Sequence, residues 1–136
     1  MSDIKKMHEK QIENLLNYSE KERYEYFVRY CADWEKVWGL VTEEDSWVIF
    51  KDETGDEIFP LWPHPDLAEI CCFQEHKDMN VKPQSIDIYS FIEGAIPDMI
   101  NHKVSFGIFF GQDRKGFIVK GEVLKEVLEE EMEQYE

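Results

Sequence analysis

The chain has 136 residues, 43% of them hydrophobic and 14% aromatic, and its formal net charge is −15. This length suits one domain, and the apolar content excludes a disordered chain. The charge argues against a nucleic acid or an anionic membrane surface as the partner, because both attract clusters of Lys and Arg.

The cysteines are Cys31, Cys71 and Cys72. An odd number, with two of them adjacent, does not indicate a disulfide framework, so we expect reduced thiols in a cytoplasmic protein. No apolar run reaches the roughly 20 residues of a membrane span. The N-terminus lacks the apolar core of a signal peptide.

Two helices are predicted at the start of the chain. Apolar residues recur at helical spacing over residues 3–18. Ser19 and Glu22 then form a capping box, which predicts a second helix to about residue 36. We expect the two helices to form an antiparallel hairpin. The residues on the inward face of the second helix are Tyr24, Phe27, Val28, Cys31 and Trp34.

Three short strands are predicted next, at residues 37–42, 46–51 and 57–61. The connections between them are short and rich in turn residues, which favours antiparallel pairing. Pro60 lacks a backbone N–H, so we expect it at a strand end or on a sheet edge.

Two further helices are predicted in the middle of the chain. Pro65 and Asp66 suit a first helical turn, and this helix is expected to run to about residue 76. After a strand at 85–88, Ser90 and Glu93 form a second capping box and predict a helix over about 91–101. Pro97 is expected to kink or split that helix.

Residues 103–110 alternate as a strand, residues 117–120 form a second short strand, and residues 121–135 form the last helix. The predicted fold class is therefore α+β, a single domain over residues 1–136 with helices on a mostly antiparallel sheet. The last helix points Glu126, Glu129, Glu130 and Glu133 mainly outward. Its inward residues are Val123, Leu124, Val127, Leu128 and Met132.

The most distinctive segment is Pro60-Leu61-Trp62-Pro63-His64-Pro65-Asp66, which we call the proline corner. Its three prolines hold a Trp and a His on a stiff backbone. One interpretation is a structural joint, in which Trp62 packs against the helical hairpin and His64 caps the next helix. The other is a rigid recognition site. Its candidate binding residues are Pro60, Trp62, Pro63, His64 and Asp66.

A metal site would draw on His64, Cys71, Cys72 and His76, with His8 or His102 as further candidates. Cys72 and His76 are four residues apart on the predicted helix. No further paired ligand motif accompanies them, and no spacing supplies a catalytic partner for His64. We therefore expect no metal, no cofactor and no catalytic residue. The tryptophans expected in or near the core are Trp34, Trp38, Trp47 and Trp62.

Several of these features together resemble a bacterial family, domain of unknown function family 2750. The specific part is the Pro-Leu-Trp-Pro-His block at 60–64. Trp38-Gly39 corresponds to a Trp-x-Gly start, here shortened to adjacent residues. Trp47, Ala68 and Cys71, the strand and Phe-bearing helix at 86–91, and a closing hairpin at 104–119 complete a match over about residues 20–120. The resemblance implies a compact bacterial cytosolic α+β protein and no particular activity.

From these observations we expect a binding or regulatory module rather than an enzyme. The high negative charge would steer a basic protein partner toward it. Two alternatives stay open. One is a small-molecule or metal-dependent enzyme centred on His64, and the other is a structural oligomer subunit, so both a monomer and a homodimer are considered.

Overall fold

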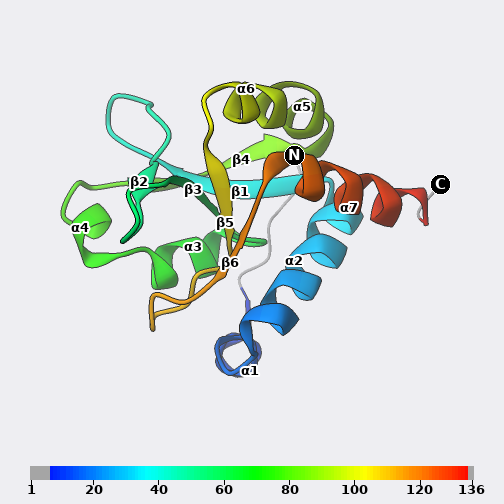
Figure 1. The fold of residues 1–136 in the computed structure, drawn as a ribbon. Helices are drawn as coiled ribbons and strands as arrows, with labels where there is room; N and C mark the ends of the chain where they lie inside the picture. The colour runs from blue at the N-terminus through cyan, green and yellow to red at the C-terminus, as the bar shows by residue number, and fades with distance from the viewer. Residues whose placement is uncertain (1–6, 135–136) are drawn as a thin grey trace.

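The computed structural model describes residues 7–134 and has the predicted α+β architecture (Figure 1). A π-helical segment, Phe91–Ala95, lies between α5 and α6. The helices and strands are α1 (Glu9–Leu16), α2 (Glu20–Trp34), β1 (Lys36–Val41), β2 (Phe50–Lys51), β3 (Glu57–Leu61), α3 (Pro65–Cys71), α4 (Gln74–Lys77), β4 (Lys82–Asp87), α5 (Ile88–Ser90), α6 (Ile96–Asn101), β5 (Ser105–Ile108), β6 (Phe117–Val119) and α7 (Gly121–Glu133).

The N-terminal helical hairpin is confirmed as α1 and α2. The capping box is present: Ser19 Oγ accepts from the Glu22 N–H at 3.1 Å, and the Ser19 N–H donates to Glu22 Oε1 at 2.9 Å. Helix α2 ends at Trp34 because Glu35 adopts a left-handed conformation with φ of 59°. Helix α1 begins at Glu9, and residues 3–6 of the predicted helix lie outside the described residues.

The strands form two sheets, one of β1 and β4 and one ordered β2-β3-β5-β6. Most pairs are antiparallel, as expected, but β3 and β5 run parallel. The strand predicted at 46–51 shrinks to Phe50–Lys51, and Trp47 makes only an isolated bridge to Val41. Strand β2 pairs only with the first two residues of β3, so Pro60 lies beyond the end of that ladder.

The helix predicted from Pro65 to residue 76 is wrong, because the chain leaves the helix at Cys72. Both Cys72 and Phe73 are extended, with ψ of 148° and 154°, and a separate short helix α4 follows. Because of this break, the Phe73 ring makes edge-to-face contacts with Phe50 and Phe110, at centroid distances of 5.0 and 5.8 Å. Aromatic packing therefore outweighs helix continuation here.

The cap predicted at Ser90 is also wrong. The helical region after β4 starts at Ile88, and the Asp87 carboxylate accepts from the N–H groups of Tyr89 and Ser90, both at 3.1 Å. Pro97 splits the helical region as expected. It lies at the start of α6, and the turns just before it are π-helical. A π-turn relieves the steric conflict that a proline creates inside an α-helix.

The last part of the chain closes the core. Strand β5 stops at Ile108 because Phe109 has a φ of 53°, and this lets both Phe109 and Phe110 be buried. Helix α7 packs beside α2 (Figure 1) and buries Leu124 and Leu128. Val123 was expected to face inward, but it is 50% exposed, because it lies in the first turn of α7 on the solvent side.

The buried core is contiguous and draws on both sheets and on helices α1, α2, α3 and α7 together with the α5–α6 region. Within residues 7–134, no helix is both long enough and apolar enough to cross a membrane.

Candidate functional site

The proline corner joins β3 to α3, and Trp62 fixes it to the core. The side chain of Trp62 is 2% exposed, and its Nε1–H donates to the carbonyl oxygen of Phe110 at 2.9 Å. The backbone of Trp62 also exchanges two hydrogen bonds with Trp38, at 3.0 and 2.7 Å. Trp62 is therefore in the core, as expected, and holds the corner against β1 and the end of β5.

His64 caps helix α3, which is one of the two roles predicted for it. Its side chain is buried, and Nδ1 accepts from the Asp66 N–H at 3.1 Å. Nδ1 is thus the unprotonated ring nitrogen in this arrangement. Pro65 occupies the first helical turn, where its missing N–H removes no hydrogen bond. Asp66 Oδ2 accepts from the Met7 N–H at 2.9 Å and so links Met7 to the corner.

The five candidate binding residues of the corner do not form one exposed surface. Pro60, Trp62, Pro63 and His64 are buried, whereas Asp66 is partly exposed. Beside the corner lie aromatic side chains of α2, and one of them, Tyr30, contacts the His64 ring.

These side chains form a row, Tyr26, Tyr30 and Trp34, spaced four residues apart along α2. Tyr26 and Tyr30 stack with centroids 5.4 Å apart, and Tyr30 and Trp34 stack at 6.0 Å. Tyr30 also meets the His64 ring edge-to-face at 6.4 Å, which joins the row to the proline corner. We refer to these three residues as the aromatic row.

Trp34 is 59% exposed, so its expected inward position is wrong. It is the last residue of α2, and the helix extends past the part of the core that buries Cys31 and Phe27. The exposure of Trp34 could not be predicted from the sequence, because Trp34 has the same helical spacing as the inward residues of α2. Trp38 and Trp47 are half-buried, consistent with their expected places near the core.

Burial is the main reason why the pKa values of both tyrosines in the aromatic row are raised. Burial raises the pKa of Tyr30, and the neighbouring Cys31, Asp33 and Asp66 raise it further. Burial, together with the neighbouring Tyr30, raises the pKa of Tyr26 to about 12. Both hydroxyls are protonated at physiological pH, and the Tyr26 hydroxyl oxygen is buried.

A groove next to the end of the aromatic row combines acidic and apolar side chains. It encloses about 260 Å³ between the α5–α6 region and the C-terminal half of α7. Tyr89 connects groove and row, since its hydroxyl donates to Glu35 Oε2 at 2.7 Å and Glu35 follows Trp34 directly. We call this site the acidic groove; its lining residues are Tyr89, Ile92, Glu93, Glu129, Met132 and Glu133.

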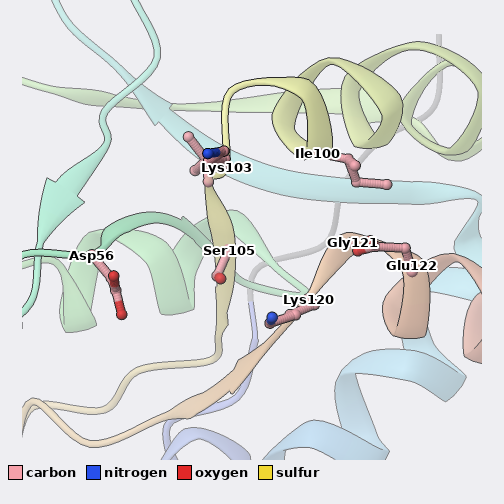
Figure 2. A pocket seen from close by; sticks show the side chains of 8 residues that line it. Asp56, Ile100, Lys103, Ser105, Lys120, Gly121 and Glu122 are labelled. Atoms are coloured by element: carbon pink, nitrogen blue, oxygen red, sulfur yellow. The ribbon is translucent and has the colours of Figure 1, made fainter.

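A second hollow, of about 350 Å³, lies where the start of α7 meets β5. Figure 2 shows Lys103, Ser105 and Lys120 around it, with Asp56 and Glu122 at its margins. Two ammonium groups beside a helix N-terminus would attract an anion, but the two carboxylates balance their charge. This hollow therefore favours neither sign of ligand.

A third groove, of about 590 Å³, has an aromatic lining that includes Phe73 and Phe110. Arg114 lies over the Phe73 ring, with its guanidinium carbon 3.8 Å from the ring centroid, and pairs with Glu75 through two hydrogen bonds of 3.0 and 3.2 Å. Both charged side chains are more than half exposed, so this ion pair lies at the surface.

The helix face predicted to carry Cys72 and His76 does not form, because the two residues lie on either side of the break after α3. Among residues 7–134, no three His, Cys, Asp or Glu side chains are grouped so that they could hold a metal ion. Burial raises the pKa of Cys71 to about 12 and raises that of Cys72. Both thiols are therefore protonated at neutral pH.

Comparison with known proteins gives one result. A family model described as protein of unknown function (DUF2750) matches residues 24–128, which confirms the resemblance expected over about residues 20–120. No curated protein and no solved structure matches the chain.

Proposed function

We propose a function for this chain, which belongs to the DUF2750 family, from the chemistry of its surface. It is a non-catalytic binding module that holds a basic segment of a partner protein in the acidic groove. The observation that carries the proposal is the composition of that groove: three glutamates surround three apolar side chains, with no Lys or Arg among its described lining residues.

The three carboxylates are available to a ligand. Glu93, Glu129 and Glu133 are exposed, and none of the ion pairs found within residues 7–134 uses them. They come from two elements, the π-helical segment and α7, so a bound cation would meet carboxylates from both sides of the groove.

The apolar part of the groove suits the stem of a basic side chain. Ile92 and Met132 are largely covered, whereas Tyr89 is 49% exposed. Lys and Arg place methylene groups on apolar surface and keep the charged end among polar groups. The net charge of −15 would also speed encounter with such a partner at low ionic strength.

One ring nitrogen of His64 has a structural role. Its Nδ1 accepts the hydrogen bond that starts α3, so use of this nitrogen as a general base would require loss of the cap. The enzymatic alternative would place its substrate at the proline corner, and the oligomeric alternative predicts a mass that rises with protein concentration.

Selection of a random-peptide display library on the folded protein tests the proposal. We expect enriched peptides to carry Lys or Arg and to bind weakly in about 1 M salt. The variant Glu93→Gln/Glu129→Gln/Glu133→Gln should bind them about tenfold less tightly, since exposed ion pairs contribute up to about 1 kcal/mol each.

The matched control is Glu43→Gln/Glu44→Gln/Glu57→Gln, which removes the same charge from exposed positions away from the groove. It should retain most of the affinity. Enriched peptides without basic residues, or equal losses in both variants, would contradict the proposal. Sedimentation of the free protein over a range of concentrations would identify the oligomeric alternative.

A further inference from the structure

The aromatic row needs an explanation that the acidic groove alone does not give. Trp34 is the most exposed of the large hydrophobic side chains within residues 7–134, and it continues a row of stacked rings rather than standing alone. A linear, partly exposed aromatic surface of this kind marks an interaction site.

The row and the acidic groove are linked through Glu35 and Tyr89. Glu35 follows Trp34, its carbonyl oxygen accepts from the Ile88 N–H at 3.0 Å, and its carboxylate accepts from the Tyr89 hydroxyl at 2.7 Å. Tyr89 lines the groove. Glu35 and Tyr89 therefore connect the C-terminal end of the row to one side of the groove.

We propose that the aromatic row and the acidic groove together bind one extended ligand, a proline-rich segment in the polyproline II conformation with a Lys or Arg at the groove end. The inference rests on the proposed function and names the class of partner. The row would hold the prolines, and the groove would hold the basic side chain.

The dimensions of the row fit such a ligand. At 1.5 Å per helical residue, the backbone from Tyr26 to Trp34 covers about 12 Å. A polyproline II segment rises about 3.1 Å per residue, so about four of its residues span the row. The segment is straight and keeps a fixed shape, as a straight row on a helix requires.

The chemistry of the surface also fits. Proline rings pack on exposed Tyr and Trp rings, and aromatic-lined surfaces are a recurrent way of recognising this conformation. The backbone carbonyls of a polyproline II segment make no internal hydrogen bonds. The neutral phenol of Tyr30 and the indole N–H of Trp34 are the kinds of donor that such carbonyls require.

The acidic surroundings select the charge of the ligand. Asp33 and Asp66 are close enough to Tyr30 to raise the pKa of its phenol, and Glu35 lies between the row and the groove. These carboxylates favour a ligand with basic residues and disfavour an acidic peptide or a nucleic acid.

Three synthetic peptides test the inference by isothermal titration calorimetry. The first repeats Ala-Pro-Pro and ends in two arginines, the second has every proline replaced by glycine, and the third has the arginines replaced by glutamine. We expect the first peptide to bind about tenfold more tightly than either of the others, since each change removes one of the two contact surfaces.

Protein variants separate the two surfaces. Trp34→Ala should weaken the first peptide about tenfold and Trp34→Phe should restore part of the loss, because a ring remains. Met79→Ala, which shortens an exposed side chain outside both surfaces, should bind as the wild type does. Unfolding midpoints equal to that of the wild type would show that the variants are folded.

The inference is overturned if the proline and glycine peptides bind equally, or if Trp34→Ala has no effect. In either case the proposed function still stands if basic peptides selected from the library depend on the three glutamates. A dimer that Trp34→Ala converts to a monomer would overturn it too, because the occupant of the row would then be a second copy of the chain.

Discussion

The indole nitrogen of Trp62 lies 2.9 Å from the carbonyl oxygen of Phe110, although 48 residues separate them in the chain. Both residues are buried. The hydrogen bond connects the proline corner to the point where the backbone leaves β5, so the corner and the β5–β6 hairpin are held in one arrangement.

Trp62→Phe should lower the free energy of unfolding by about 2–4 kcal/mol. The change leaves the Phe110 carbonyl without its partner in a dry environment and opens a small cavity. Urea unfolding followed by circular dichroism measures the loss. Trp34→Phe, at an exposed position, should change stability by less than about 0.5 kcal/mol; equal effects at the two sites would contradict the assignment of Trp62 as a core residue.

Arg23→Lys should destabilise the protein by about 2–3 kcal/mol. The Arg23 guanidinium is 4% exposed and donates to the carbonyls of Leu16 and Lys115, at 2.7 and 2.9 Å, which joins α1 to the β5–β6 hairpin. One ammonium group cannot reproduce this two-pronged geometry. Denaturant unfolding tests the prediction, with Arg29→Lys on the exposed face of α2 as the control.

Ser19→Ala and Asp87→Ala should each cost about 1 kcal/mol, because each removes the side chain that caps a helix. Ser90→Ala should change stability by less than about 0.5 kcal/mol, since Ser90 lies inside the helical region and caps nothing. Thermal unfolding of the three variants distinguishes them. If Ser90→Ala lost as much stability as Asp87→Ala, the helix would have its cap at Ser90, as the sequence pattern predicts.

His76 should make the protein less stable as the pH falls below about 6.5. Burial lowers the pKa of His76, the neighbouring Arg114 lowers it further, and Glu75 opposes the shift. The unfolded chain therefore takes up a proton more readily than the folded chain, and the stability present above pH 6.5 is lost as the pH decreases.

Comparison of the free energy of unfolding at about pH 7.5 and pH 5.5 tests this effect. His76→Gln should show a smaller decrease than the wild type, because glutamine does not titrate. Titration of the His76 ring by NMR should give a midpoint below 6.5. An unchanged decrease in the variant, or a midpoint above 6.5, would contradict the prediction.

Features set by neighbouring residues were predictable from the sequence. The Ser19–Glu22 capping box and the start of α3 at Pro65 depend on atoms within one helical turn, and both are present. The break at Cys72 was not predictable, because it depends on where Phe50 and Phe110 offer space for the Phe73 ring. Helix propensity depends on the local sequence, so it cannot reveal a contact between residues that are far apart in the chain.

The candidate binding surface was also predictable only in part. The four-residue spacing of Tyr26, Tyr30 and Trp34 is visible in the sequence, but the point at which α2 extends beyond the core is not. The outward glutamates of α7 were predicted. Their position opposite Glu93 depends on packing between segments far apart in the chain, so the acidic groove could be found only in the folded structure.

The parallel pairing of β3 with β5 also determines how the chain must fold. Ile58 pairs with Ser105, and every residue from α3 to α6 lies in the loop that this contact closes. Closing so long a loop costs chain entropy before any ladder bond compensates for it. The α1–α2 hairpin and the β2–β3 turn can form from local contacts. We expect pairing of β3 with its distant partner β5 to limit the refolding rate.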